Sequence, residues 1–170
     1  AVHLLERYRD KVCCYNDDVQ GTAGITLAGM INACKIKGTQ LRDESYLFLG
    51  AGSAGIGLSN LLCSALVMEG LTLEEARSRI HMIDAYGLLE STRTDLVDFQ
   101  LPHAHPHAPM GPGRFAEAVE TFKPTTIIGV STTGGAFDKK VVEAMSRVNE
   151  RPIILALSNP TEKAECTAEQ

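Results

Sequence analysis

Two neighbouring carboxylates, Asp17 and Asp18, stand in the stretch YNDDVQGTAG at residues 15–24. Because small and apolar residues follow directly, at least one of these aspartates could have a function that needs a charge near the core. The same acids would also be ordinary at the start of a helix, where they interact favourably with the helix dipole. The local pattern leaves both interpretations open, a functional carboxylate and a solvated helix start.

A glycine-rich turn, GAGSAG, begins at Gly50 and matches the G-x-G-x-x-G pattern of dinucleotide-binding turns. It follows the apolar run at residues 45–49 and opens a predicted helix at residues 54–68, as phosphate binding requires. We expect Gly50 to make the tight turn, Gly52 to admit a pyrophosphate and Gly55 to let helix and strand pack closely. The N-terminus of the helix would then present free N–H groups to the phosphates.

An acidic residue at the end of the next predicted strand completes this fingerprint. Asp84 closes the run IHMID, 29 residues after Gly55 against a usual distance of about 20. A predicted helix at residues 72–79, opened by a T-x-x-E capping box, accounts for the extra length. A carboxylate there suits the free 2′-hydroxyl of NAD and repels the 2′-phosphate of NADP, although Arg93 could reach back from the loop. The pattern favours NAD and leaves NADP possible, and a solvated strand end remains the alternative for Asp84.

The apolar pattern along the chain alternates between helices and strands. Helices are predicted at residues 1–12, 22–37, 54–68, 72–79, 114–122 and 137–148, and strands at residues 45–49, 80–84, 125–130 and 153–157. The strands are apolar throughout, which is typical of parallel strands whose two faces are both covered. The sequence therefore predicts an α/β fold with a doubly wound, Rossmann-type, mainly parallel sheet and helices on both faces.

Two groups of eye-catching residues are better explained without a ligand. His103, His105 and His107 lie in the proline-rich stretch at residues 101–113, which we interpret as a flexible surface loop and not as a metal site. The adjacent pair Cys13-Cys14 could form a disulfide only with strained geometry, so we expect both thiols to be packed.

Composition excludes several classes of function. The 170 residues suffice for one compact domain, and the net charge of −5 with no basic cluster argues against a nucleic-acid partner. No apolar run approaches the roughly 18 residues that span a bilayer, and no signal-peptide pattern is seen. Five cysteines, an odd number, do not indicate a disulfide framework, so we expect an intracellular protein.

Taken together, five motifs closely resemble those of the malic enzymes. They are, in order, YNDDVQGTAG, GAGSAGIG, IDAYGLL, IIGVSTTGGAF and RPIILALSNPTEKAEC, and the resemblance runs from Tyr8 through Glu169. It implies oxidative decarboxylation of L-malate to pyruvate and CO₂, with reduction of NAD or NADP and a requirement for Mg²⁺ or Mn²⁺. It also implies that residues 16–170 form the NAD(P)-binding domain and that residues 1–15 form a helix leading in from a preceding domain, which this chain lacks.

The resemblance also assigns site residues. It implies that Asp18 is a metal ligand, that Asp17 lies beside the site and that Asn159 faces both the substrate and the nicotinamide ribose. With the fingerprint residues, the expected cofactor-binding set is Thr22, Gly50, Gly52, Ser53, Ala54, Gly55, Asp84, Val130, Ser131 and Asn159.

Several parts of the family's catalytic machinery have no match in this sequence. The general-acid tyrosine, the general-base lysine and a Glu-Asp pair that completes the metal site lie upstream in the family. We therefore expect no catalytic residue in these 170 positions and an inactive isolated chain.

The full-length protein is expected to be a homo-oligomer, a dimer or a tetramer, in the cytoplasm or the mitochondrial matrix.

Two other functions share part of this pattern. Another two-domain NAD(P)-dependent dehydrogenase, such as an amino-acid dehydrogenase, would have the glycine turn but has no use for NDDVQGTA or ALSNPTEKAEC. A non-catalytic dinucleotide-binding sensor would explain the missing tyrosine and lysine. An upstream Glu-Asp pair would decide for the enzyme over the sensor.

Overall fold

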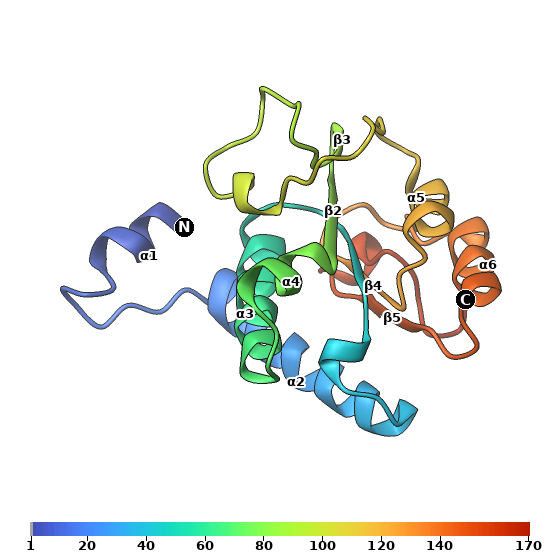
Figure 1. Ribbon diagram of the computed structural model, residues 1–170, viewed down its shortest axis with the longest axis horizontal. Helices are drawn as coiled ribbons and strands as arrows, with labels where there is room; N and C mark the ends of the chain where they lie inside the picture. Colours follow the sequence, from blue (N-terminus) through green and yellow to red (C-terminus); the bar gives the residue numbers. More distant parts are fainter. Residues whose placement is uncertain (1) are drawn as a thin grey trace.

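A five-stranded sheet forms the centre of the molecule, in the strand order β3-β2-β1-β4-β5 (Figure 1). The computed structural model describes residues 2–170, so the part of the first predicted helix at Ala1 lies outside the described residues. The strands are β1 (Tyr46–Leu49), β2 (Ile80–Asp84), β3 (Gly87–Leu88), β4 (Thr126–Gly129) and β5 (Ile153–Ala156). All neighbouring pairs are parallel except β2 and β3.

Helices cover both faces of this sheet. The helices are α1 (Val2–Tyr8), α2 (Thr22–Lys37), α3 (Ser53–Met68), α4 (Leu73–Ser78), α5 (Phe115–Phe122) and α6 (Lys139–Val148). In Figure 1, α2, α3 and α4 lie on one side of the strands and α5 and α6 on the other. The doubly wound arrangement predicted from the apolar strands is therefore confirmed. Within residues 2–170, every helix is too short or too polar to cross a membrane.

The alternation of side chains along β1 explains the two-sided core. Leu47 packs with residues of α5 and α6, whereas Tyr46 and Phe48 belong to the cluster shared with α2 and α3. All three side chains are almost completely buried, and each buried apolar side chain of this size contributes about 1.5–3 kcal/mol to folding. A central strand with both faces apolar thus holds the two helical layers together.

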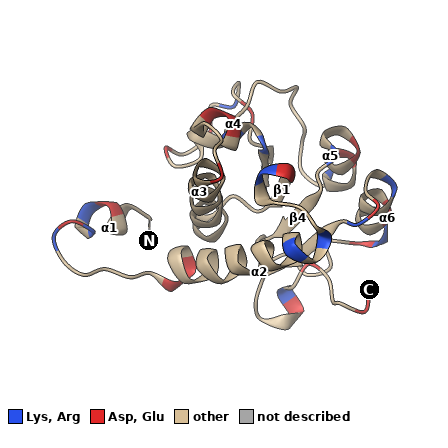
Figure 2. Ribbon diagram, turned by 60° about the horizontal axis from the view of Figure 1, so that its bottom comes forward, with Lys and Arg blue, Asp and Glu red and all other residues tan. Residues whose placement is uncertain are grey.

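The first helical layer begins with the acidic motif. A short helical turn, η1 (Asp17–Gly21), runs directly into α2, and Figure 2 shows acidic residues at the start of this helix and basic residues at its end. This placement of charge complements the helix dipole. The helix stops at Gly38, whose φ of 84° is left-handed, as expected for a C-terminal glycine.

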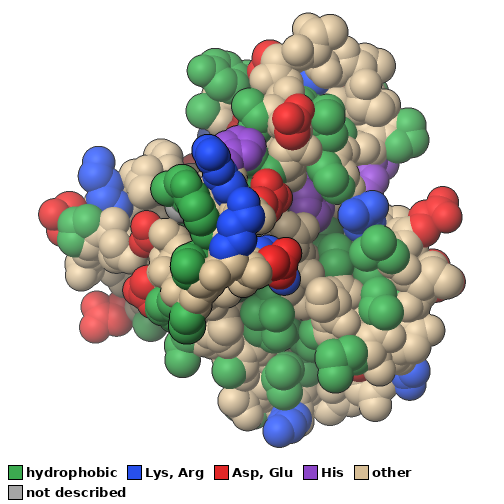
Figure 3. All heavy atoms as spheres, turned by 90° about the vertical axis from the view of Figure 1, so that its left-hand side faces the viewer, with side chains coloured by type: hydrophobic (Ala, Val, Ile, Leu, Met, Phe, Trp, Pro, Cys, Tyr) green, Lys and Arg blue, Asp and Glu red, His purple; other side chains and the backbone are tan. Residues whose placement is uncertain are grey.

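Other predicted boundaries fare differently. The capping box is confirmed, because the Thr72 hydroxyl accepts a hydrogen bond from Glu75 N and the Glu75 carboxylate accepts one from Thr72 N. The first predicted helix, by contrast, ends at Tyr8 and buries none of its residues, with Leu4 and Tyr8 exposed. Figure 3, viewed from the left-hand side of Figure 1 where α1 lies, shows hydrophobic side chains on this surface. Helical spacing alone could not reveal how little of α1 is covered, although the His3 ring lies 6.0 Å from that of Phe99 between centroids.

Two sequence interpretations were wrong. The stretch at residues 101–113 is not simply a surface loop, because His103 is completely buried, with its Nδ1 3.1 Å from Ser59 Oγ and its Nε2 3.2 Å from Asn60 Oδ1. The Cys13 thiol is exposed and not packed. The physical reason for the first error is that residues of α3 supply polar partners, which let a histidine lie in the interior.

A histidine cluster lies where this stretch returns to the sheet. His81 of β2 stacks on Phe122 with 4.2 Å between ring centroids, and His105 and His107 lie 5.3 and 4.9 Å away. His81 Nδ1 is buried and has no hydrogen-bond partner among residues 2–170. Burial, reinforced by the two neighbouring imidazoles, lowers the pKa of His81 to about 4.

This pKa predicts a loss of stability in acid. Between about pH 6.5 and 4 the unfolded chain binds a proton at His81 that the folded chain does not, so the free energy of unfolding falls as pH falls through this window. His81→Phe keeps the stacking but cannot titrate. Urea unfolding at pH 7 and pH 4 is expected to show that the variant loses roughly 2–3 kcal/mol less than the wild type. Equal losses in both proteins would contradict the assignment.

Candidate functional site

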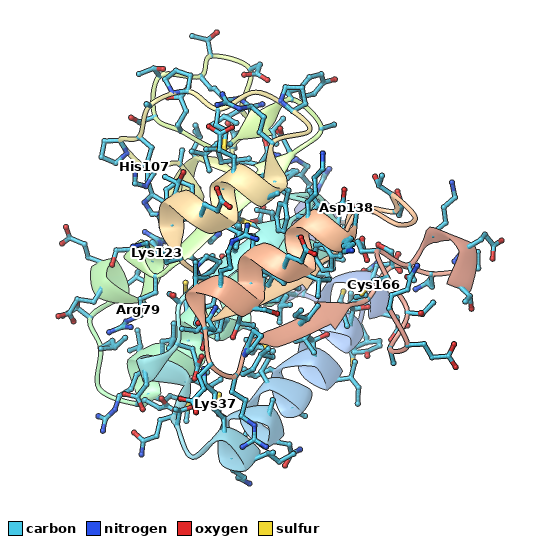
Figure 4. All side chains as sticks on the ribbon, turned by 90° about the vertical axis from the view of Figure 1, so that its right-hand side faces the viewer. Lys37, Arg79, His107, Lys123, Asp138 and Cys166 are labelled. Atoms are coloured by element: carbon cyan, nitrogen blue, oxygen red, sulfur yellow. The ribbon has the colours of Figure 1, made fainter. Side chains whose placement is uncertain are left out.

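A cleft of about 970 Å³ opens at the carboxyl ends of β1, β2 and β4. Its walls come mainly from residues 49–52, 83–86 and 130–133, the segments that follow these three strands, together with the start of α6. Figure 4 shows the polarity of the sheet: Arg79 and Lys123, which precede β2 and β4, lie at the opposite end from Asp138 and Cys166, which follow β4 and β5. Ligands of open parallel sheets bind at this carboxyl end.

The glycine turn forms the floor of the cleft. Gly50 has φ of 115°, and a Cβ there would overlap the carbonyl oxygen of Val130. A Cβ at Gly55 would lie 2.6 Å from Gly50 O, so helix α3 could not approach the strand with any larger residue. A Cβ at Gly52 would have open space around it. The tight turn at Gly50 and the close packing at Gly55 are thus as predicted, and Gly52 leaves room beside the backbone.

The start of α3 is available to an anion. No side chain caps this helix at Gly52, and the first intrahelical bond runs from Ile56 N to Gly52 O. The amide groups of Ser53 and Ala54 therefore keep their hydrogen-bonding capacity at the positive end of a 16-residue helix. The side chain of Gln100 donates to Ala51 O at 3.1 Å and fixes the loop that faces this turn.

Asp84 lies at the other side of the cleft and is engaged by an arginine. Arg93 Nη1 and Nη2 each lie 2.9 Å from one of its carboxylate oxygens, and Asp84 Oδ1 also accepts from the backbone N–H groups of Tyr86 and Gly87. Both side chains are only 13% exposed, so Asp84 is not a solvated strand end.

The same arginine binds a second acid. Arg93 donates to both oxygens of Asp95, through Nε at 3.0 Å and Nη2 at 2.6 Å. These bonds to Asp95, with those to Asp84, raise the pKa of Arg93, while the pKa of Asp95 is lowered. The triad of Asp84, Arg93 and Asp95 carries a net charge of −1 at neutral pH.

The remaining predicted cofactor residues divide into two groups. Val130 and Ser131 line the cleft on the β4 side, together with Thr132. Thr22 and Asn159 are not among the residues lining it, and Asn159 is an exposed residue three positions beyond β5. The structure therefore brings together Gly50, Gly52, Asp84 and the end of β4. Ser53, Ala54 and Gly55 follow directly in α3 without lining the cleft, and Thr22 and Asn159 lie apart from its lining.

The acidic motif lies beside α3 and faces outward. The Asn16 side chain accepts from Val19 N at 3.0 Å, and the backbone of Val19 packs so closely on Gly57 that a Cβ there would overlap Val19 O. This anchoring leaves Asp17 and Asp18 exposed, with Tyr15 donating to Asp17 Oδ1 at 3.1 Å. Both carboxylates are therefore accessible at the surface beside α3.

The metal-ligand set in these residues is incomplete. Within residues 2–170, no group of three or more His, Cys, Asp or Glu side chains is arranged to hold a metal ion. A hard divalent cation normally needs further protein oxygens beyond one carboxylate. Asp18 thus fits one position of such a site, and the other ligands would have to come from outside these residues.

Several cleft residues were missed by the sequence analysis. Phe99 and Gln100 come from the loop after β3, and Lys140 comes from the first turn of α6. None of them belongs to a recognisable motif, because loop segments distant in sequence bring them to the cleft. Arg93, which contacts Asp84 at the side of the cleft, was by contrast indicated by its position as the first base after Asp84.

The geometry suits an extended ligand with two ends and a charged middle. The uncapped α3 N-terminus would receive a pyrophosphate, with Asp84 on the β2 side and Val130 and Ser131 on the β4 side. The β1–α3 turn lies between those two sides, because β1 pairs with both β2 and β4.

Comparison with known proteins gives a consistent result. The family model described as "Malic enzyme, NAD binding domain" matches residues 19–170. The chloroplastic NADP-dependent malic enzyme of Flaveria trinervia is 48% identical over 172 residues, covering 100% of this chain and 26% of that protein. The NAD-dependent malic enzyme of Vibrio parahaemolyticus is 42% identical, covering 98% of this chain and 31% of that protein.

A solved structure agrees with these relatives. The malic enzyme of Entamoeba histolytica superposes with a TM-score of 0.73 at 27% identity, covering 95% of this chain and 32% of that chain. The present chain therefore spans between about a quarter and a third of the length of these three relatives.

Two glycine substitutions should separate ligand binding from packing. Gly52→Ala adds a methyl group where the structure is open, so we expect stability within about 0.5 kcal/mol of wild type. The methyl group would occupy the space assigned to the pyrophosphate, so we expect a roughly tenfold loss of NADH affinity. Gly55→Ala forces the helix from the strand and should lower the free energy of unfolding by about 1–3 kcal/mol. For both variants, denaturant unfolding measures the stability and fluorescence titration measures the NADH affinity. Unchanged NADH affinity in Gly52→Ala would contradict the phosphate assignment.

Proposed function

The chain belongs to the malic enzyme family, whose NAD-binding domain matches it, and from this premise we propose that it forms the cofactor half of an NAD(P)-dependent malic enzyme. The whole protein would convert L-malate to pyruvate and CO₂ while reducing the dinucleotide. The observation that carries this proposal is the cleft where an uncapped helix N-terminus lies between Asp84 and the end of β4. The family match also removes the amino-acid dehydrogenases as an alternative.

The bound dinucleotide would span the cleft from β2 to β4. We assign the adenosine ribose to Asp84 and the pyrophosphate to the turn at Gly52, with the amides of Ser53 and Ala54 as donors. Val130 and Ser131 would hold the nicotinamide half, where the hydride from malate would be accepted. This assignment is supported by the lining of the cleft and by the strand order.

Three residues outside the cleft would complete the site. Thr22 follows the acidic motif at the start of α2, and we assign it a position close to the cofactor. Asn159 would reach the nicotinamide ribose and the substrate from the segment after β5. Asp18 would be one ligand of Mg²⁺ or Mn²⁺, a metal that when bound polarises the substrate oxygens and stabilises the enolate left by CO₂. The other ligands and the acid–base groups would come from outside this chain.

The charge beside the ribose site favours NAD over NADP. NADP carries a 2′-phosphate at the ribose, and binding it usually requires a free arginine. Arg93 is the basic group in reach, but Asp84 and Asp95 already take its donors and leave the triad with a net charge of −1. A phosphate placed there would meet net repulsion. Because the relatives include both NADP- and NAD-dependent enzymes, this charge would be a point at which cofactor preference diverges.

Removing one of the two acids should therefore change cofactor preference. Asp95→Asn releases Arg93 from an ionic partner without touching Asp84, and we expect the ratio of NADPH to NADH affinity to rise about three- to tenfold. Asp98→Asn is the matched control, because it makes the same change of charge at an exposed position of the same loop. An equal ratio in both variants would contradict the role of the triad.

The metal-ligand role of Asp18 and the absence of the acid–base groups are tested with two proteins, the 170-residue chain and the full-length protein. The isolated chain should bind NADH yet form no NADH from L-malate, NAD and Mn²⁺, because the acid–base groups are not in it. In the full-length protein, Asp18→Asn should lower kcat at least about 100-fold and leave NADH affinity unchanged. Turnover by the isolated chain would contradict the division of the site. A full-length protein that binds NADH but is inactive towards malate would favour the sensor alternative.

A further inference from the structure

A completely buried carboxylate lies behind the β4 side of the cleft. Glu165, two residues beyond the short helical turn η4 (Thr161–Lys163), has 0% of its surface exposed. Its Oε1 accepts hydrogen bonds from Ser131 N at 2.9 Å, from Ser131 Oγ at 2.8 Å and from Ser158 Oγ at 2.6 Å. None of the ion pairs found within residues 2–170 includes Glu165, so hydroxyl and amide donors compensate its charge.

These bonds join two loops that follow neighbouring strands. Ser131 comes directly after the residue that follows β4, and Ser158 lies two residues beyond β5. Two backbone hydrogen bonds join the end of the loop after β4 to the segment around Glu165. They run from Gly135 N to Ala164 O at 3.0 Å and from Phe137 N to Glu165 O at 2.9 Å. The loop at residues 131–137 is therefore fixed at its start by the carboxylate and at its end by the backbone.

The network extends to a strained residue in the cleft wall. Ser158 Oγ accepts a hydrogen bond from Thr132 N at 2.8 Å, and Thr132 has φ of 57°. This left-handed conformation is rare and costly for a β-branched residue, so it persists only where its surroundings hold it. Thr132 lines the cleft beside Ser131. The chain from Glu165 through Ser158 to Thr132 thus maintains the shape of the cleft wall.

The sheet makes room for the carboxylate. A Cβ at Gly129, the last residue of β4, would overlap Glu165 Cδ and lie 2.6 Å from its Cγ. A glycine at this position lets the Glu165 side chain lie flat against the end of the strand. The carboxylate therefore packs against the carboxyl end of β4, which the nicotinamide half would approach.

We propose that Glu165 is a positioning residue for the nicotinamide half of the cofactor. It would act through Ser131 and Ser158, by holding the loop after β4 in the shape that receives the nicotinamide, without touching the dinucleotide itself. The adenosine half would be less sensitive to it, because Glu165 bonds to the segments after β4 and β5, whereas the glycine turn follows β1 and Asp84 ends β2. This inference rests on the proposed function and adds a residue to it.

A second buried carboxylate provides the matched control. Glu44 is 1% exposed and accepts hydrogen bonds from Lys37 Nζ at 2.7 Å and Thr39 Oγ1 at 2.6 Å. It precedes β1 and therefore lies at the amino ends of the strands, away from the cleft. Removing it should disturb folding without disturbing the nicotinamide loop.

The test compares the affinities of NADH and ADP, which lacks the nicotinamide half. In the 170-residue chain, Glu165→Ala should weaken NADH binding at least about tenfold and leave ADP binding within about twofold of wild type. Glu165→Gln, whose amide oxygen can still accept from the two serines, should recover most of the affinity. Ser158→Ala, a milder change, should weaken NADH binding about three- to tenfold and serves if Glu165→Ala does not fold.

Glu44→Ala completes the design. It should lower thermal stability as Glu165→Ala does but change neither NADH nor ADP affinity. Equal loss of NADH and ADP affinity in the Glu165 and Ser158 variants would reduce Glu165 to a structural role and overturn the inference. Unchanged NADH affinity in folded Glu165→Ala or in Ser158→Ala would overturn it as well. Failure of the wild-type chain to bind NADH at all would instead overturn the proposed function.

Discussion

The close approach of the Gly50 backbone to the carbonyl of Val130 is the contact on which the candidate site depends. A side chain at Gly50 would push the β1–α3 turn away from the end of β4, and the same displacement would separate Gly55 from the turn. The strands continue their hydrogen bonds into these turns, with Val130 N donating to Leu49 O at 2.8 Å, so the ends of β1 and β4 are held in contact. The cleft is therefore a consequence of how tightly two strand ends meet.

The features that depend on a local pattern were predictable from the sequence, and those that depend on loops were not. The strands, the glycine turn and the capping box each carry a signal within a few residues, and the structure has all of them. The sequence indicated that Arg93, the first base after Asp84, could reach back to it, and the structure shows this contact. The burial of His103 against α3, more than forty residues away in the sequence, has no local signal. The short strand β3 was also missed, because two residues cannot form a pattern.

Four carboxylates of this chain illustrate how position in the fold determines how an acid is compensated. Asp84 pairs with an arginine in the cleft wall, Glu44 with a lysine at the amino ends of the strands, and Glu165 with serine hydroxyls and an amide. Asp18 alone of these four is exposed. A buried acid must be satisfied within the chain, whereas an exposed acid beside an anchored turn is free to bind a partner or an ion. The resemblance to malic enzymes assigns a metal to this acid, and its exposure is consistent with that assignment.

The most direct test of the central claim is to map where NADH binds in the isolated chain. Titration of ¹⁵N-labelled protein should shift the amide resonances of the glycine turn at residues 50–55, of Asp84 and Tyr86, and of the loop at residues 131–133. A second hollow, lined by Lys37, Thr39, Asn149, Glu150 and Arg151, lies at the other end of the sheet and provides the comparison. The account predicts that resonances there stay in place. Shifts confined to that second hollow, or no shifts at saturating NADH, would contradict it.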